Sequence, residues 1–134
     1  MESNETKLNF AASLKANNIA VSMVSLNEYS KQIQLFLNQI NIEGDNEIEK
    51  TNKDLCLDTI NKSLDSTSNV LDEYIRFGER IPFLLHGVNK NNDNIKLFKQ
   101  IAICYLDIAK ILKDERVNRL SFAFADELIN NDNK

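Results

Sequence analysis

The segment from Asn94 to Leu112 has the clearest hydrophobic pattern in the chain. Its apolar residues recur at steps of three and four, which is the spacing of one face of an α-helix. Further apolar residues widen this face, so we expect the helix to be contacted from more than one side. The pattern therefore predicts the central helix of a bundle over residues 94–112, with Asp93 or Asn94 as its N-terminal cap.

A second long pattern extends over residues 8–42, with Ser30 as the gap in its apolar seam. Such a seam is typical of a long helix that packs at a shallow angle. The pair at residues 17–18 consists of two asparagines, which disfavour helix, and Ser25 with Glu28 forms a capping box that would start a second helix. The sequence therefore leaves open whether this helix is continuous or broken near Ser25.

The middle of the chain predicts one helix from about Asn46 to Phe77, which Gly78 would end. Ser, Thr and Asn are frequent at residues 63–69, where their side chains compete for backbone hydrogen bonds. A bend or a split is therefore expected near Ser66.

The end of the chain predicts two further elements. Pro82 suits the first turn of a short connector helix over residues 83–86. A turn at residues 113–114 separates the central helix from a last helix that begins at about Glu115. The polar residues 1–6 and 130–134 are expected to be frayed.

Together these elements predict an all-α fold, in which residues 1–134 form a single helical-bundle domain of four main helices and one short connector helix. The composition agrees with this fold. The chain has 134 residues, which suffice for one domain, and its 3 Gly and 1 Pro are few for a protein built on tight β-turns.

Charge and cysteine content narrow the possible functions. The net charge is −4 and no basic stripe is visible, so neither nucleic acid nor an acidic membrane is an expected partner. No leader pattern or long apolar run stands out, and we expect a cytoplasmic protein. The 19 asparagines suggest an AT-rich genome, such as that of a low-GC bacterium or phage.

Cys56 and Cys104 lie inside apolar helical patterns at a spacing that matches no metal motif. We expect two buried free thiols; a disulfide between two helices is the alternative. A di-iron bundle needs Glu-x-x-His motifs, which the only histidine does not provide. No phosphate-binding loop or nucleophile motif is present, so we assign no catalytic residue, metal or cofactor.

Arg80 and His86 form an R-x5-H pattern. This pattern resembles the Arg-x4-6-His signature of HEPN-type ribonucleases, which are small all-helical domains that usually pair. The resemblance implies that the arginine and histidine of two subunits converge at a dimer interface to cut RNA. The simpler interpretation is a histidine that forms a hydrogen bond at the end of a short helix.

Two clusters suit a protein-binding surface. The apolar run at residues 81–85 either plugs the end of the bundle or forms a docking patch. Arg116 and Arg119 beside Phe122 form a cationic-aromatic corner suited to an acidic partner. The expected partner-binding residues are Ile81, Phe83, Leu84, Arg116, Arg119 and Phe122.

The sequence favours a non-enzymatic protein–protein interaction module, such as an adaptor, a chaperone, an immunity protein or a phage-encoded inhibitor. Its partner would be a protein of unknown identity, and the N-terminal seam, including Leu8 and Ile19, is a possible homodimer surface. The first alternative is a HEPN-like ribonuclease that uses Arg80 and His86. The second is a helical structural subunit of a larger complex.

Overall fold

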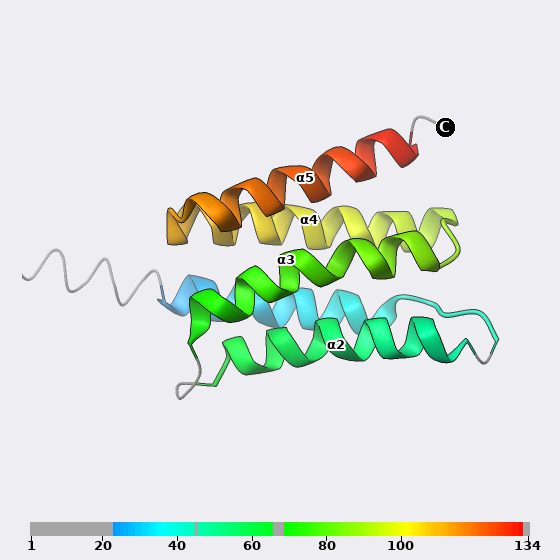
Figure 1. Cartoon of the computed structure of the whole chain (residues 1–134), viewed down its shortest axis with the longest axis horizontal. Helices are drawn as coiled ribbons and strands as arrows, with labels where there is room; N and C mark the ends of the chain where they lie inside the picture. Colours follow the sequence, from blue (N-terminus) through cyan, green and yellow to red (C-terminus); the bar gives the residue numbers. More distant parts are fainter. Residues whose placement is uncertain (1–22, 45, 66–68, 133–134) are drawn as a thin grey trace, which may run out of the picture.

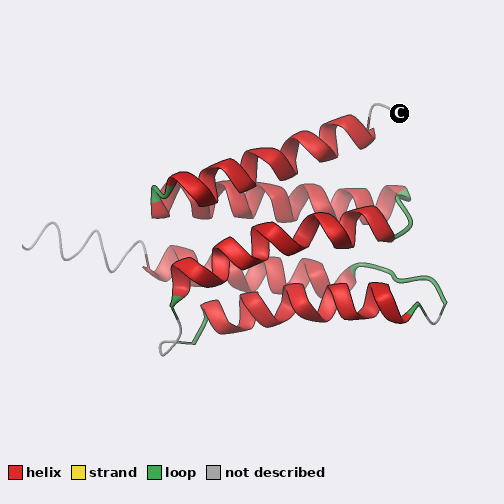
Figure 2. Cartoon of the chain, viewed as in Figure 1, coloured by secondary structure: helices red, strands yellow, loops and turns green. Residues whose placement is uncertain are grey.

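The structure of the chain is a computed structural model, which describes residues 23–44, 46–65 and 69–132. Within these ranges the chain is all-α, with five helices and no strand (Figures 1 and 2). The described part of the first helix covers residues 23–39 and is called the N-terminal helix below. The others are α2 (Glu47–Ser63), α3 (Val70–Gly87), α4 (Asn92–Leu112) and α5 (Glu115–Asp132).

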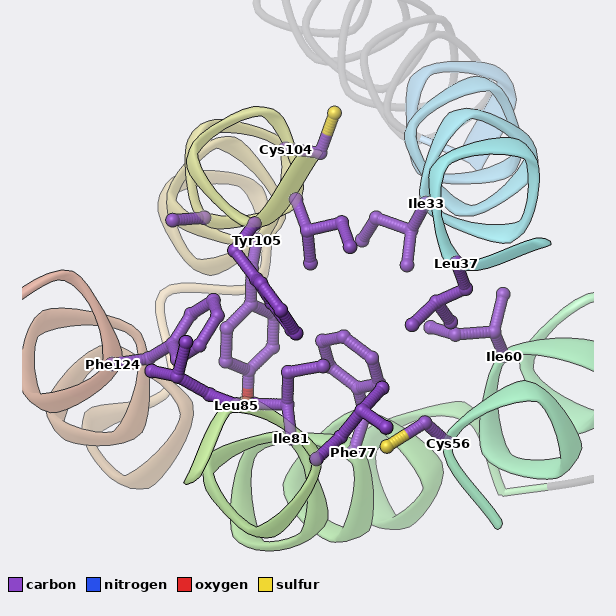
Figure 3. Packing of buried hydrophobic residues seen from close by; sticks show 14 of the residues in the cluster. Ile33, Leu37, Cys56, Ile60, Phe77, Ile81, Leu85, Cys104, Tyr105 and Phe124 are labelled. Carbon is purple, nitrogen blue, oxygen red and sulfur yellow. The ribbon is translucent and has the colours of Figure 1, made fainter. Parts of the chain in front are cut away.

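The five helices lie side by side and alternate in direction, as the colours of Figure 1 show. Viewed along the helices, the side chains of the N-terminal helix, α2, α3 and α4 meet in a common centre (Figure 3). The fifth helix, α5, packs against α4 and α3. Each helix contributes apolar side chains to one continuous core, among them Ile33, Ile60, Phe77, Tyr105 and Phe124.

The all-α prediction is confirmed, but the predicted arrangement of four main helices and one short connector helix is not. Gly78 does not end a helix: it lies inside α3, which continues through Pro82 to Gly87. Gly78 is required there by close packing, because a Cβ atom at this position would collide with the Tyr105 hydroxyl and the Leu120 side chain. The expected short helix is therefore the last part of α3.

The split expected near Ser66 is confirmed. Helix α2 ends at Ser63 and α3 begins at Val70, with residues 66–68 outside the described part of the chain. Asn69 caps α3 by accepting a hydrogen bond from the backbone N–H of Asp72 at 3.3 Å. Because the Asn side chain satisfies a free N–H group at the helix start, it favours a new helix over continuation of the previous one.

The N-terminal helix is already helical at residue 23, so Ser25 does not start it. The part of the possible break that precedes residue 23 and the dimer residues Leu8 and Ile19 lie outside the described residues. Ser30, the gap in the apolar seam, is fully buried. Its hydroxyl lies 2.6 Å from the Tyr74 hydroxyl and accepts a hydrogen bond from Ser63 at 3.2 Å, which joins three helices through a buried polar network.

Helix α4 begins two residues earlier than the sequence suggested, with Asn91 as its cap. Asn94 is instead buried at the end of the bundle. Its side-chain oxygen accepts from the Asn41 backbone N–H at 3.0 Å, and its side-chain nitrogen donates to the carbonyls of Asn41 at 3.1 Å and Asn89 at 2.8 Å. This one amide therefore joins the loop before α2 to the start of α4.

The predicted turn at residues 113–114 is confirmed. Lys113 adopts the left-handed conformation with φ 54° and ends α4. The side chain of Asp114 accepts hydrogen bonds from the N–H groups of Arg116 at 3.0 Å and Val117 at 3.1 Å. These bonds start α5 at Glu115, as expected from the sequence.

Replacing Asn94 with Ala should destabilise the fold, because the Asn41 N–H and carbonyl lose a partner at a partly buried site. We expect a loss of about 1–3 kcal/mol in the free energy of unfolding, measured by urea denaturation. Asn92→Ala, at an exposed position of the same helical turn, is the control and should change it little. Equal effects of the two substitutions would contradict the role of the Asn94 amide.

Gly78→Ala tests the close approach of α3, α4 and α5. The added methyl group would meet buried atoms of Tyr105 and Leu120, so we expect destabilisation by about 1–3 kcal/mol despite the higher helix propensity of Ala. Phe83→Ala, at an exposed position of the same helix, serves as the control. A Gly78→Ala variant more stable than the wild type would refute this packing.

Candidate binding surfaces

The apolar run at residues 81–85 is mostly core. Ile81 and Leu84 are fully buried, whereas Phe83 is 67% exposed. Successive helical residues are rotated by about 100°, so Phe83 points away from the side that Ile81 and Leu84 share. This corrects the expected docking patch: a partner could reach Phe83 but not Ile81 or Leu84.

Of the predicted corner of Arg116, Arg119 and Phe122, the structure turns Arg116 toward a neighbouring helix. The Arg116 guanidinium turns toward α3, where it lies 3.5 Å from the Glu79 carboxylate. Arg119 is exposed, and Phe122 is 57% exposed on α5. The aromatic ring is therefore available to a partner, while Arg116 contributes to the contact between α3 and α5.

An apolar groove lies between α4 and α5 and is here called the α4–α5 groove. It is lined by Lys99, Ala102, Ile103, Leu106, Ala125, Leu128 and Ile129. Ile103 and Ile129 are each more than half exposed. Phe122 lies two turns before Ile129, so it extends the same apolar side of α5.

The sequence does not identify Ile103 as a contact residue, because its apolar side chain fits the widened buried face predicted for the central helix. A signal was nevertheless present: Ile103 has the same helical phase as Lys96, Lys99 and Lys110. An apolar residue in the centre of a lysine strip is a candidate for a contact outside the core. Lys110 also pairs with Asp107 at 3.7 Å.

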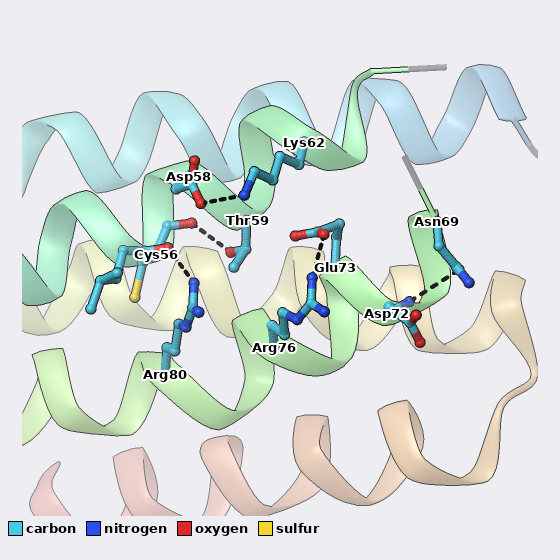
Figure 4. A network of polar contacts seen from close by, with 10 residues as sticks. Cys56, Asp58, Thr59, Lys62, Asn69, Asp72, Glu73, Arg76 and Arg80 are labelled. Atoms are coloured by element: carbon cyan, nitrogen blue, oxygen red, sulfur yellow. Dashed lines mark hydrogen bonds and ion pairs between the residues drawn. The ribbon is translucent and has the colours of Figure 1, made fainter. Parts of the chain in front are cut away.

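The candidate nuclease residues point to opposite sides of α3. Arg80 donates a hydrogen bond to the Leu55 carbonyl at 3.3 Å, on the α2 side (Figure 4). The Nε2 atom of His86 lies 3.3 Å from the Glu127 carboxylate, on the α5 side. Within one chain, Arg80 and His86 therefore do not share a site, and each connects α3 to a different neighbouring helix.

The ion pairs near Arg80 are local to their own helices (Figure 4). Lys62 pairs with Asp58 at 3.1 Å on α2, and Arg76 pairs with Glu73 at 2.7 Å on α3. Glu73 is buried, so its pairing with Arg76 compensates for part of the cost of removing a carboxylate from water. These two ion pairs therefore stabilise individual helices.

Cys56 and Cys104 are free and buried, which confirms the expected thiols and not the disulfide. Burial raises the pKa of Cys56 to about 12, and the nearby Arg80 charge offsets only part of this rise. Burial, together with the Asp107 charge, raises the pKa of Cys104 to about 11. Both side chains are therefore thiols at neutral pH, and thiols are poor nucleophiles.

Two further findings concern metal binding and membrane crossing by the described residues. Across 23–44, 46–65 and 69–132, no cluster of three or more His, Cys, Asp or Glu side chains is arranged to bind a metal ion. In the same ranges no helix has the length and apolar character needed to cross a bilayer.

No known protein family, curated protein or solved structure matches this chain. Its function must therefore be argued from its own residues.

The thiol pKa values predict slow chemical modification. At pH 8 both cysteines should react with a thiol reagent roughly a hundredfold or more slowly in the folded protein than in denaturant, where the pKa returns to about 8.5. Because folding raises both pKa values, their contribution to stability is complete below the unfolded pKa and is lost as the pH rises through about 11 to 12. Absorbance during reaction with a disulfide reagent measures the rates; equal rates in the folded and denatured states would contradict burial.

Proposed function

We propose that this chain is a non-enzymatic protein-binding module, acting in the cytoplasm, whose α4–α5 groove receives an amphipathic helix of a partner protein. The observation that carries the proposal is the exposure of three large apolar side chains beside one groove: Ile103 at 53%, Phe122 at 57% and Ile129 at 57%. Scattered single apolar residues are normal on a surface, but a cluster around a groove is typical of an interaction site.

A helix is the occupant that fits the shape of this surface. The groove lies between two long helices that run side by side, and a third helix can pack its side chains between theirs. Helix-in-groove recognition uses apolar anchors spaced by three, four and seven residues. Ile103 with Leu106 on one wall and Ala125 with Ile129 on the other provide apolar contacts for such anchors. Phe122 extends the second wall along α5.

The charge of the residues at the groove indicates what kind of partner helix would bind. Lys99 is the one charged residue among those that line the groove, and Lys96 is exposed on the same strip of α4. Acidic residues that flank the apolar stripe of a partner helix would complement these ammonium groups and accelerate encounter. The proposed partner segment is therefore both amphipathic and acidic.

The test uses partner capture from cells of the source organism with the whole chain as bait, followed by binding measurements on the captured protein. Ile103→Glu places a carboxylate in the groove and should weaken binding of that protein at least about tenfold, because an apolar anchor then meets a buried charge. Leu35→Glu is the matched control, since Leu35 is 58% exposed on the N-terminal helix. It should leave binding unchanged.

Two results would overturn the proposal. One is equal loss of binding in the Ile103→Glu and Leu35→Glu variants, and the other is a bound segment that is not helical by NMR. Light scattering on the isolated chain adds a further check. A dimer that Ile103→Glu dissociates would show that a second copy, and not an acidic helix, occupies the groove.

A further inference from the structure

A pocket at one end of the bundle contains a buried carboxylate, one oxygen of which has no hydrogen-bond donor. It is lined by Ile42, Glu43, Asn46, Glu49, Gly87, Val88 and Asn89. Glu49 is only 7% exposed, and its Oε2 atom is buried with no hydrogen-bond partner. We infer that this pocket binds an ammonium or guanidinium group that donates N–H hydrogen bonds to Glu49.

The Glu49 carboxylate lies directly against the backbone of Gly87. A Cβ atom added to Gly87 would collide with both of its oxygens, so a residue without a side chain is needed opposite the carboxylate. The first turn of α2 is electrostatically favourable for an acid, but it supplies no donor to Oε2. A buried carboxylate in this state is costly unless a cation or a donor satisfies it.

The surroundings of the pocket favour a cation. Helix α3 ends at Gly87, and the last carbonyl groups of a helix carry partial negative charge. The Lys90 ammonium already donates to the carbonyls of His86 at 3.1 Å and Val88 at 3.5 Å, so this end of α3 accepts an ammonium group within the chain. Glu43 adds a second carboxylate at the exposed rim.

An N–H donor fits this site better than a divalent metal ion. Calcium needs six to eight oxygen ligands, but much of the oxygen here is already engaged. Glu43 Oε1 accepts from the Asn89 amide at 2.6 Å, and the Asn46 side-chain oxygen accepts from the Glu49 backbone N–H at 3.2 Å. An ammonium or guanidinium group needs few acceptors, and the pocket volume of about 350 Å³ leaves room for an attached alkyl chain.

The experiment is an NMR titration of the full chain with n-butylammonium chloride at constant ionic strength. Saturable shifts should appear at the backbone amides of Glu49, Gly87 and Asn89. Tetramethylammonium, which has the charge but no N–H group, should produce none of them. N-acetyl-lysine amide identifies the source of the group: tighter binding than butylammonium indicates a lysine side chain of a protein, and equal binding indicates a free amine.

Substitutions assign the effect to the carboxylate. Glu49→Gln keeps the shape of the side chain and removes its charge. It should weaken butylammonium binding at least about tenfold, because the loss of a hydrogen bond to a charged group lowers affinity by about this factor. Glu47→Gln, an exposed acid in the same turn of α2, is the matched control and should bind like wild type. Glu43→Gln should weaken binding by a smaller factor, and it keeps the test valid if Glu49→Gln does not fold.

The inference is overturned if wild type shows no saturable shift, if tetramethylammonium binds equally, or if Glu49→Gln retains full affinity. It is also overturned if calcium ions, but not butylammonium, shift the same amides. The pocket and the α4–α5 groove are formed by different residues, so Ile103→Glu should leave butylammonium binding unchanged. Failure of one proposal therefore does not imply failure of the other.

Discussion

The contact that the Tyr105 side chain of α4 makes with α3 is the constraint on which we expect the rest of the packing to depend. The Tyr105 hydroxyl donates to the Tyr74 carbonyl at 2.7 Å, and its ring packs edge-on against Phe77 with 5.1 Å between ring centroids. This approach is possible only because Gly78 has no side chain. Burial is the main cause of the raised pKa of Tyr105, and the Glu79 and Asp114 charges raise it further by smaller amounts. The hydroxyl therefore remains a donor at neutral pH.

The contact also determines which apolar surface is covered and which is left free. With the Tyr105 side chain joining α4 to α3, α5 packs on both helices, and the N-terminal helix and α2 complete the core (Figure 3). The ring of Phe98 on α4 packs against that of Phe124 on α5, with 6.3 Å between ring centroids, and this contact holds α5 to α4. Ile103 lies outside these contacts. The packing that builds the core thereby creates the α4–α5 groove at its edge.

The sequence predicted best the elements whose signals are local. Periodicity places the start of α4 within two residues, although its cap is Asn91 and not Asp93 or Asn94. The start of α5 is predicted correctly because Asp114 acts on the backbone within three residues. Helix α3 was mispredicted because Gly78 and Pro82 read as helix breakers, and only the tertiary approach of Tyr105 explains the glycine. The site residues could be predicted less well than the helices. The burial of Ile81 and Leu84, the exposure of Ile103 and the pocket around Glu49 all depend on which helices become neighbours.

A partner can bind in the α4–α5 groove only if Ile103 lies outside the core. Ile103 is nevertheless two residues from Ile101, which is fully buried. The most direct test compares the free energies of unfolding of Ile103→Gln and Ile101→Gln by urea denaturation. We predict a loss of about 1 kcal/mol or less for Ile103→Gln and about 3 kcal/mol or more for Ile101→Gln. Similar large losses for both would show that Ile103 is packed within the chain and that the groove is not free for a partner.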